Sequence, residues 1–254
     1  MSDELIVTYV ENICVMTINR PQARNAVNGA TARAIAEAVD ALDERDDLSV
    51  GVITGAGGTF CAGMDLRGFL DGDRPSIEGR GFAGLVEQPP RKPLIAAVEG
   101  YALAGGCEIA IASDLVVAAE TAKFGLPEVK RGLVPTGGGA LKLHRQLPYH
   151  VAMELLFTGD WLTADRALQY GFVNRVVPEG AALDAALELA RTIAGNGPLA
   201  LEAIKRIVRE SQDWSAAEGV RTQREIADPV FRSADAREGA KAFTERRAPV
   251  WTRR

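Results

Sequence analysis

Three short apolar runs, separated by segments of helical composition, constrain the fold of this chain more than any other feature. They occupy residues 50–54, 94–98 and 115–119. Apolar runs of this length, bounded by glycines or polar residues, are typical of strands that are buried on both faces. Because they alternate with helical segments such as residues 31–42, the sequence predicts an α/β layered fold. A hairpin is expected over residues 5–18, which argues against a purely parallel sheet.

Helical patterns dominate the chain from about residue 149, and the only strand expected there covers residues 172–177. The predicted helices of the C-terminal quarter cover residues 181–194, 199–211, 216–227 and 234–246. Their apolar faces exceed what a small terminal region can bury, so we expect them to pack against another subunit. The sequence therefore predicts an α/β core over residues 1–180 and a C-terminal all-helical oligomerisation region over residues 181–254.

Composition and charge exclude several classes of protein. The chain has 254 residues, of which 47% are hydrophobic, and its formal net charge is −5. No apolar run is long enough to span a membrane and no charged-then-apolar leader is present, so we expect a soluble protein. Lysines and arginines are interspersed with acidic residues, which argues against a nucleic-acid-binding surface.

The three cysteines and two histidines narrow the possible chemistry. Cys14, Cys61 and Cys107 lie in apolar stretches without the spacing of metal ligands. This pattern indicates buried thiols in a reducing compartment, and we therefore expect a cytoplasmic protein. His144 and His150 belong to no recognisable catalytic or zinc-binding pattern. The sequence predicts no metal site and gives little support to a Ser-His-Asp triad.

Two glutamates, Glu108 and Glu128, are the leading candidates for acid–base chemistry. Glu108 follows a glycine-rich run at the expected start of a helix, where backbone N–H groups can point at an anion. Glu128 follows Pro127 in an otherwise apolar segment. Two carboxylates in an apolar cleft can adopt different pKa values, so that one serves as acid and the other as base. The alternative is a structural role, as a helix-dipole partner for Glu108 and a solvated loop residue for Glu128.

Two glycine-bearing turns, at residues 60–65 and 104–106, follow expected strands. If the turns lie together, they can supply two backbone N–H donors to one oxygen, as in an oxyanion hole. Glycine after a strand also forms ordinary turns, so neither motif is specific by itself. The glycine run at residues 137–139 is equally open. It could begin a helix near a phosphate, but it lacks a P-loop lysine and the spacing of a dinucleotide-binding motif.

The motifs together resemble the crotonase superfamily of enoyl-CoA hydratases and isomerases, over nearly the whole chain. In chain order they are NRP at residues 19–21, NA at 25–26, FCAGMDL at 60–66, KPLIAAV at 92–98, GYA at 100–102, AGGCE at 104–108, FGLPE at 124–128, GLVP at 132–135 and AFTERR at 242–247. The resemblance implies a spiral of ββα units followed by helices that assemble a homotrimer or homohexamer. It also implies a lyase of fatty acid or other lipid metabolism. The activity that the resemblance implies is that of an enoyl-CoA hydratase, which adds water to a trans-2-enoyl-CoA. Coenzyme A would be part of the acyl-CoA thioester substrate, and no separate cofactor is expected.

The resemblance further implies roles for individual residues. The backbone N–H groups of Met64 and Gly105 match the oxyanion hole, which holds the thioester carbonyl as it gains enolate character. Glu108 matches the base that activates the water attacking C3. Glu128 matches the acid that protonates C2. Members that isomerise or cleave their substrate often lack one of these two glutamates, so the presence of both favours hydration.

Residues that match the coenzyme A site lie in three parts of the chain. The backbone around Ala62 and Leu66 matches the segment that contacts the adenine end. Ala23 and Arg24 match the segment that contacts the pantetheine and phosphates, and Arg24 can supply a cation to a phosphate. Phe243, in the last helix, matches a position that often closes over coenzyme A.

One residue departs from the pattern of the hydratases. Thr136 stands where many of them have glycine, and its side chain can narrow the acyl pocket or add a hydroxyl near the water. This departure keeps a carnitinyl-CoA dehydratase-like enzyme open as an alternative. Two further alternatives also stay open: a Δ3,Δ2-enoyl-CoA isomerase, and a non-catalytic CoA- or RNA-binding scaffold with the same fold. The glycine- and charge-rich segment at residues 71–90 is expected to form a mobile loop over the acyl pocket.

Overall fold

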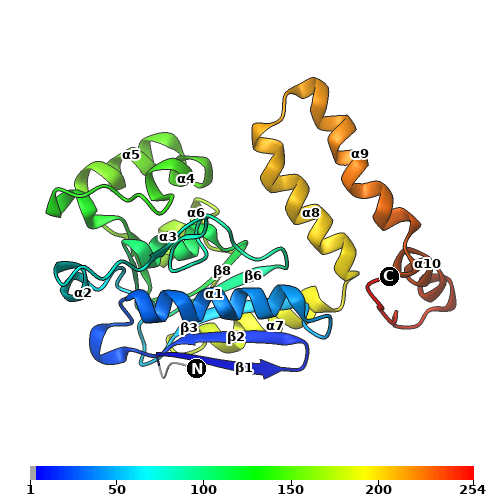
Figure 1. Cartoon of the computed structure of the whole chain (residues 1–254), viewed down its shortest axis with the longest axis horizontal. Coiled ribbons are helices and arrows are strands. Elements are labelled where there is room, and N and C mark those ends of the chain that lie inside the picture. Colours follow the sequence, from blue (N-terminus) through cyan, green and yellow to red (C-terminus); the bar gives the residue numbers. More distant parts are fainter. Residues whose placement is uncertain (1–3) are drawn as a thin grey trace.

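A six-stranded mixed sheet lies at the centre of the protein (Figure 1). The structure, a computed structural model, describes residues 4–254. The strand order is β1-β2-β3-β6-β8-β11, in which β1 and β2 form an antiparallel hairpin and every other neighbouring pair is parallel. These strands are β1 Leu5–Val10, β2 Ile13–Ile18, β3 Val50–Gly55, β6 Leu94–Val98, β8 Leu115–Ala119 and β11 Arg175–Val177. The predicted α/β class and the opening hairpin are confirmed.

The inner strands β2, β3, β6 and β8 are buried on both faces of the sheet, which explains their continuous apolar character. Neighbouring residues of a strand face opposite layers, so that Met16 lies in one core and Val15 in the other. Helix α1, Gly29–Glu44, covers the first face. Helix α7, Ala182–Ala194, covers the second face with small side chains at every fourth position, and it packs with the core although the predicted boundary places it in the C-terminal region. The alanines concerned are Ala186, Ala190 and Ala194.

A second, three-stranded sheet turns the fold into a spiral. Its strands, in the order β10-β9-β7, are β10 Leu162–Thr163, β9 Lys123–Gly125 and β7 Tyr101–Leu103. Strand β7 follows β6 through Gly100, whose φ of 56° is left-handed backbone that favours glycine, and leads into helix α3, Gly105–Ala112. Strands β8 and β9 repeat this arrangement and lead into the 3₁₀ helix η2, Pro127–Arg131. The repeating ββα unit implied by the resemblance is therefore present.

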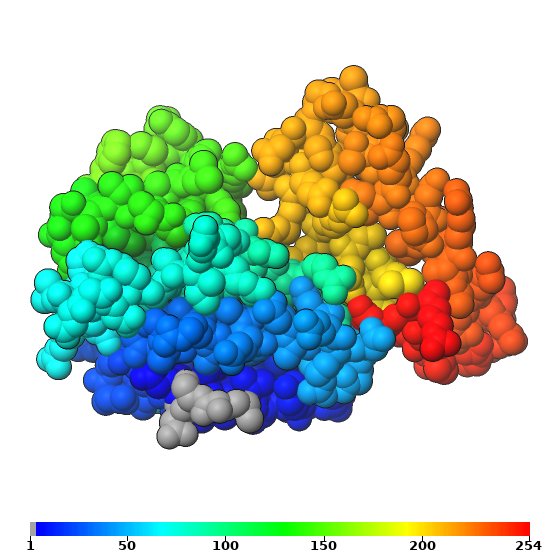
Figure 2. All heavy atoms as spheres, viewed as in Figure 1, coloured from blue at the N-terminus to red at the C-terminus, as the bar shows by residue number. Residues whose placement is uncertain are grey.

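Three helices project from this body as an arm, which Figure 1 shows beside the core. The arm consists of α8 Pro198–Glu210, α9 Ala216–Arg232 and α10 Ala234–Glu245, with η3 Ser211–Asp213 between the first two. The other helices are η1 Pro21–Ala23, α2 Leu66–Leu70, α4 Gly139–Gln146, α5 Tyr149–Thr158 and α6 Ala164–Gln169. Figure 2 shows a hollow between the arm and the region of α4 and α5. None of the helices within residues 4–254 is long and apolar enough to cross a membrane.

Three local predictions differ from the structure. Residues 71–90 are not simply a loop, because β4 Ser76–Ile77 and β5 Gly81–Phe82 form a short hairpin and the residues that follow are buried. The C-terminal half contains β10 as a further strand. Strand β11 is shorter than predicted because the amides of Phe172 and Val173 donate to the carbonyl of Ala167 in α6 instead of to a neighbouring strand. Helix α9 continues through Pro229 instead of ending at residue 227.

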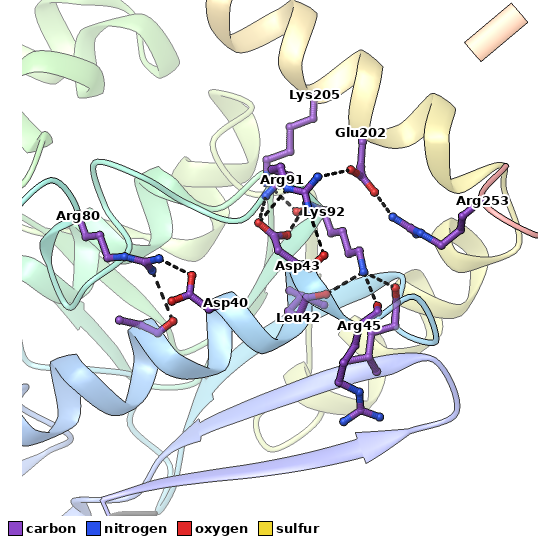
Figure 3. Close-up of polar contacts among 12 residues, drawn as sticks. Asp40, Leu42, Asp43, Arg45, Arg80, Arg91, Lys92, Glu202, Lys205 and Arg253 are labelled. Atoms are coloured by element: carbon purple, nitrogen blue, oxygen red, sulfur yellow. Dashed lines mark hydrogen bonds and ion pairs between the residues drawn. The ribbon is translucent and has the colours of Figure 1, made fainter. Parts of the chain in front are cut away.

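A buried lysine closes the end of α1. Lys92, which is 1% exposed, donates from Nζ to the carbonyls of Leu42 at 2.8 Å, Arg45 at 2.6 Å and Leu48 at 2.8 Å (Figure 3). The last carbonyl groups of a helix have no N–H donor inside the helix. A positive charge at this end also interacts favourably with the helix dipole. Lys92 therefore holds the end of α1 against the start of β6.

The same residue begins a network that fixes the arm to the core. Lys205 of α8 donates from Nζ to the carbonyl oxygen of Lys92 at 2.8 Å. Glu202, one turn earlier on α8, bridges Arg91 of the core and Arg253 of the C-terminal tail (Figure 3). The base of the arm is therefore attached by hydrogen bonds and ion pairs, of which the Arg91–Glu202 pair is exposed and the contacts of Lys205 and Arg253 are largely buried.

Replacement of Lys92 by methionine should destabilise the protein strongly. Methionine can fill the apolar path of the lysine stem but leaves the buried carbonyls of Leu42 and Leu48 without their donor. The carbonyl of Arg45 keeps the amide of Leu48 at 3.2 Å. We expect a loss of about 2–5 kcal/mol in the free energy of unfolding, measured by denaturant titration. Lys130→Met is the matched control, because Lys130 forms only an exposed ion pair with Asp160 at 2.8 Å and should cost less than about 1 kcal/mol. Equal losses for the two variants would contradict this role of Lys92.

Candidate active site

A cleft of about 650 Å³ opens between α3, η2 and the turn that precedes α2. Residues that are far apart in the sequence meet in its walls. The predicted site residues that line it are Arg24, Ala62, Met64, Leu66, Gly105, Glu108, Glu128 and Thr136. The structure therefore brings the two glutamates, the two proposed amide donors and most of the expected coenzyme A contacts to one place.

The two glycine-bearing turns lie against each other at the floor of this cleft. Cys61 and Ala102 form a parallel bridge that joins the two segments. A Cβ atom on Gly63 would lie 3.2 Å from the backbone nitrogen of Gly105, and one on Gly106 would lie 2.1 Å from the carbonyl oxygen of Cys61. Only glycine allows so close an approach of backbone to backbone.

This contact leaves two amides without an acceptor. Gly105 is the first residue of α3, so its N–H has no partner inside the helix. Within residues 4–254, neither this amide nor that of Met64 donates to a backbone carbonyl. Ala104 precedes the pair with a φ of 52°, a conformation that costs a non-glycine residue energy and is held because its N–H donates to Gly125 at 2.9 Å. Both free amides border the cleft and can bind one oxygen.

Glu108 lies in the first turn of α3 and is only 4% exposed. Its Oε1 accepts a hydrogen bond of 2.9 Å from the amide of Gly139, the first residue of α4. Burial raises the pKa of Glu108, whereas the amides of Gly139 and Gly137 and the charge of Lys142 lower it. A Cβ atom on Gly137 would lie 2.3 Å from Oε2 of Glu108, so the glycine run is needed for this contact.

Glu128 lies in η2 and has a different environment. Its Oε2 is buried and has no hydrogen-bond partner within the described part of the chain. Burial raises the pKa of Glu128 to about 7; the charge of Glu108 also raises it, and that of Arg131 lowers it. Glu128 is therefore protonated in a large share of molecules near neutral pH and can donate that proton, whereas the amides beside Glu108 favour the ionised form of Glu108.

The segments expected to bind coenzyme A are tied together by hydrogen bonds. The amide of Ala62 donates to the carbonyl of Arg24 at 3.0 Å. Asn25, buried and with a φ of 56°, holds this bend through hydrogen bonds from Nδ2 to residues 56 and 59. Arg24 and Leu66 are exposed at the cleft, and Ala23 lies directly before Arg24 in η1 without lining the cleft itself.

Phe243 is the predicted residue that the structure does not bring to the site. It is 85% exposed on α10 and does not line the cleft, because the arm projects away from the core. Within one chain Phe243 therefore does not reach the cleft, and its part in binding coenzyme A stays a prediction. Four residues that approach Glu108 or line the cleft were not predicted as part of this site, namely Gly137, Gly139, Arg74 and Arg131. The glycine run was the only signal for the first two.

Comparison with known proteins agrees with this geometry. The enoyl-CoA hydratase/isomerase family model matches residues 8–254. The chain is 46% identical to enoyl-CoA hydratase EchA19 of Mycobacterium tuberculosis, over 94% of this chain and 93% of that protein. It is 43% identical to carnitinyl-CoA dehydratase of Salmonella typhi, over 99% of both. The structure superposes on enoyl-CoA hydratase EchA1 from Mycobacterium marinum with a TM-score of 0.98 and 55% identity, over 100% of both chains. The chain belongs to the enoyl-CoA hydratase/isomerase family, and its resemblance to the crotonase superfamily is confirmed.

Proposed function

We propose that this protein is an enoyl-CoA hydratase, a lyase that adds water across the double bond of a trans-2-enoyl-CoA. The observation that carries the proposal is the pair of inequivalent carboxylates, Glu108 and Glu128, beside two unpaired amides in one cleft. Hydration needs a base for the water and an acid for the carbon, whereas isomerisation needs only one group that moves a proton. The scaffold alternative gives no reason to bury two carboxylates together.

The geometry supports a defined role for each group. The thioester oxygen accepts hydrogen bonds from the amides of Met64 and Gly105, which stabilise the negative charge that develops on it. Glu108 accepts a proton from water as the water oxygen bonds to C3. Glu128 gives its proton to C2, and the electron pair of the double bond forms the new C2–H bond. The product is a 3-hydroxyacyl-CoA, and proton exchange with solvent restores both carboxyl groups.

Crotonyl-CoA tests the proposal directly. Hydration removes the conjugation between the double bond and the thioester, so the absorbance of the conjugated system should fall when the protein is added. A 3-enoyl-CoA, supplied separately, tests the isomerase, because the same absorbance should rise. No change with either substrate would favour the non-catalytic scaffold.

A carnitinyl-CoA dehydratase-like activity is a second candidate. It is favoured by Thr136, a hydroxyl-bearing residue that lines the cleft, and by similarity to proteins of that name. The carnitinyl-CoA hydratase from Mycobacterium avium has a TM-score of 0.80 to this structure at 43% identity, over 100% of both chains. Dehydration of carnitinyl-CoA, compared with hydration of crotonyl-CoA under the same conditions, separates the two candidates.

The rate should depend on pH through Glu128. Its protonated form is the acid, and its pKa is raised to about 7. The kcat/KM for crotonyl-CoA should therefore fall about tenfold per pH unit above about pH 7. Because the reaction also needs Glu108 ionised, the rate should fall again at low pH. A rate that stays constant between about pH 6 and pH 9 would exclude Glu128 as the acid.

Stability gives an independent measure of the same group. A carboxyl whose folded-state pKa is raised binds its proton more tightly when folded, so its contribution to stability is present at low pH and is lost as pH rises through about 7. Glu128→Gln removes this loss. The difference in melting temperature, variant minus unchanged protein, should therefore be larger at about pH 8 than at about pH 5.

We also infer that the C-terminal region, residues 181–254, mediates assembly into a homotrimer or homohexamer. The arm exposes large apolar side chains, which water would solvate at a cost of roughly 25 cal/mol per Å². They include Ile204, Val208, Val220, Phe231 and Phe243. In such an assembly Phe243 could close over the coenzyme A site of a neighbouring subunit. Light scattering of the full chain and of a chain truncated before Ala234 tests this, and a monomeric full chain with full activity would contradict it.

We also propose a cytoplasmic location, and the three buried free thiols agree with it.

A further inference from the structure

Arg131 lies beside the proposed acid of the reaction. It is the last residue of η2, three positions after Glu128. Side chains three residues apart in a 3₁₀ helix lie on the same face, about 6 Å apart along the axis. Both residues line the cleft, and the charge of Arg131 acts on Glu128. In coenzyme A the pantetheine arm separates the phosphates from the thioester, so a cation next to the group that protonates C2 faces the acyl part of the substrate.

The charge of Arg131 has no matching anion in the reactive state. Within residues 4–254 it forms no ion pair, and its one hydrogen bond runs from Nη1 to the carbonyl of Pro127 at 3.4 Å. Its neighbour Glu128 must carry a proton to act as acid and is then neutral. Lys130 differs, because its charge is matched by Asp160 at 2.8 Å on the outside of η2.

The other described residues near Arg131 in the cleft also provide no anion to pair with its charge. Leu133 and Val134 expose 40% and 66% of their surface, and Thr136 adds a hydroxyl donor. The one further acidic side chain in the lining, Glu87, packs against Gly81 and faces the charge of Lys142. An acyl group that ends in an anion would therefore meet donors here.

We propose that Arg131 is a specificity-determining residue that selects enoyl-CoA substrates whose short acyl group ends in a carboxylate. The guanidinium would bind this carboxylate through charge-assisted hydrogen bonds, which it can make with two oxygens at once. The inference rests on the proposed hydratase function, since it identifies the substrate class of the same cleft.

Two substrates of similar size test the proposal. Glutaconyl-CoA ends in a carboxylate, and trans-2-pentenoyl-CoA ends in a methyl group. The unchanged protein should hydrate glutaconyl-CoA with a kcat/KM that is about 10- to 100-fold higher. Arg131→Gln should abolish this preference, and Arg131→Lys should restore part of it. Lys130→Gln, which removes the neighbouring charge outside the cleft, should leave the preference unchanged.

Binding of the saturated esters separates this proposal from the proposed reaction. Glutaryl-CoA and valeryl-CoA can be compared by calorimetry even if neither unsaturated substrate is hydrated. Tighter binding of glutaryl-CoA that depends on Arg131 would support the site without the hydratase. The proposal would be overturned if the unchanged protein hydrated or bound the carboxylated compound no better than its methyl-ended counterpart. A preference that survives Arg131→Gln would also overturn it.

Discussion

Replacement of Glu108 or Glu128 by glutamine should reduce hydration of crotonyl-CoA by about 100- to 10,000-fold at neutral pH. This is the range that a positioned general acid or base contributes. Glutamine keeps the size of each side chain, but it cannot accept a proton from water or donate one to carbon with comparable ease. Steady-state kinetics gives the loss in kcat. Calorimetry with a saturated acyl-CoA should show binding that is largely unchanged.

The double variant distinguishes joint action from independent damage. Both groups act on one water and one double bond, so the combined loss should be smaller than the product of the two single losses. A loss under about tenfold at either position would remove that residue from the mechanism. The free energies of unfolding of the two single variants should also differ. Glu108 accepts a hydrogen bond from the amide of Gly139, whereas Oε2 of Glu128 has no partner in the described structure.

Loss of the Gly105 amide should reduce turnover by at least about 100-fold, since one oxyanion-hole donor contributes this much in acyl-transfer enzymes. Proline removes the donor and is tolerated at the first position of a helix. However, a Cβ atom at this position would lie 2.4 Å from the ring of Phe82. The measurement therefore needs a background in which Phe82→Ala has removed the ring.

In that background, Gly105→Ala is the matched control. Alanine adds the same Cβ atom but keeps the N–H, so only proline should cause the large loss in kcat. Met64→Leu also keeps its amide and should be tolerated far better than Gly105→Pro. Equal damage from alanine and proline would mean that packing, and not hydrogen-bond donation, explains the importance of this position.

The sequence predicted the elements whose apolar pattern is local. The strands at residues 50–54, 94–98 and 115–119 and the helix that begins near Glu108 were recognisable because each pattern lies within one short segment. The repeating ββα unit was not visible as a sequence repeat, since its second strands are only about three residues long. Strand β10, with two residues, carries almost no pattern at all.

Contacts between distant segments were beyond the sequence. The amide of Gly139 reaches Glu108 across 31 positions, and nothing in a glycine run specifies which side chain it will hold. Phe82 approaches Gly105 only because residues 76–82 form a hairpin in a segment that has the composition of a loop. The position of Phe243 depends on the direction of the arm, which the network around Lys92 and Glu202 fixes.

Isotope labelling tests the central claim that the protein adds water across the double bond, with the water oxygen bonding to C3 and a solvent-derived proton to C2. Crotonyl-CoA should be incubated with the protein in water enriched in both oxygen-18 and deuterium, and the product analysed by mass spectrometry and NMR. The account predicts a 3-hydroxyacyl-CoA with solvent oxygen at C3 and solvent deuterium at C2. Deuterium incorporation without oxygen, or an unlabelled thioester after prolonged incubation, would contradict it.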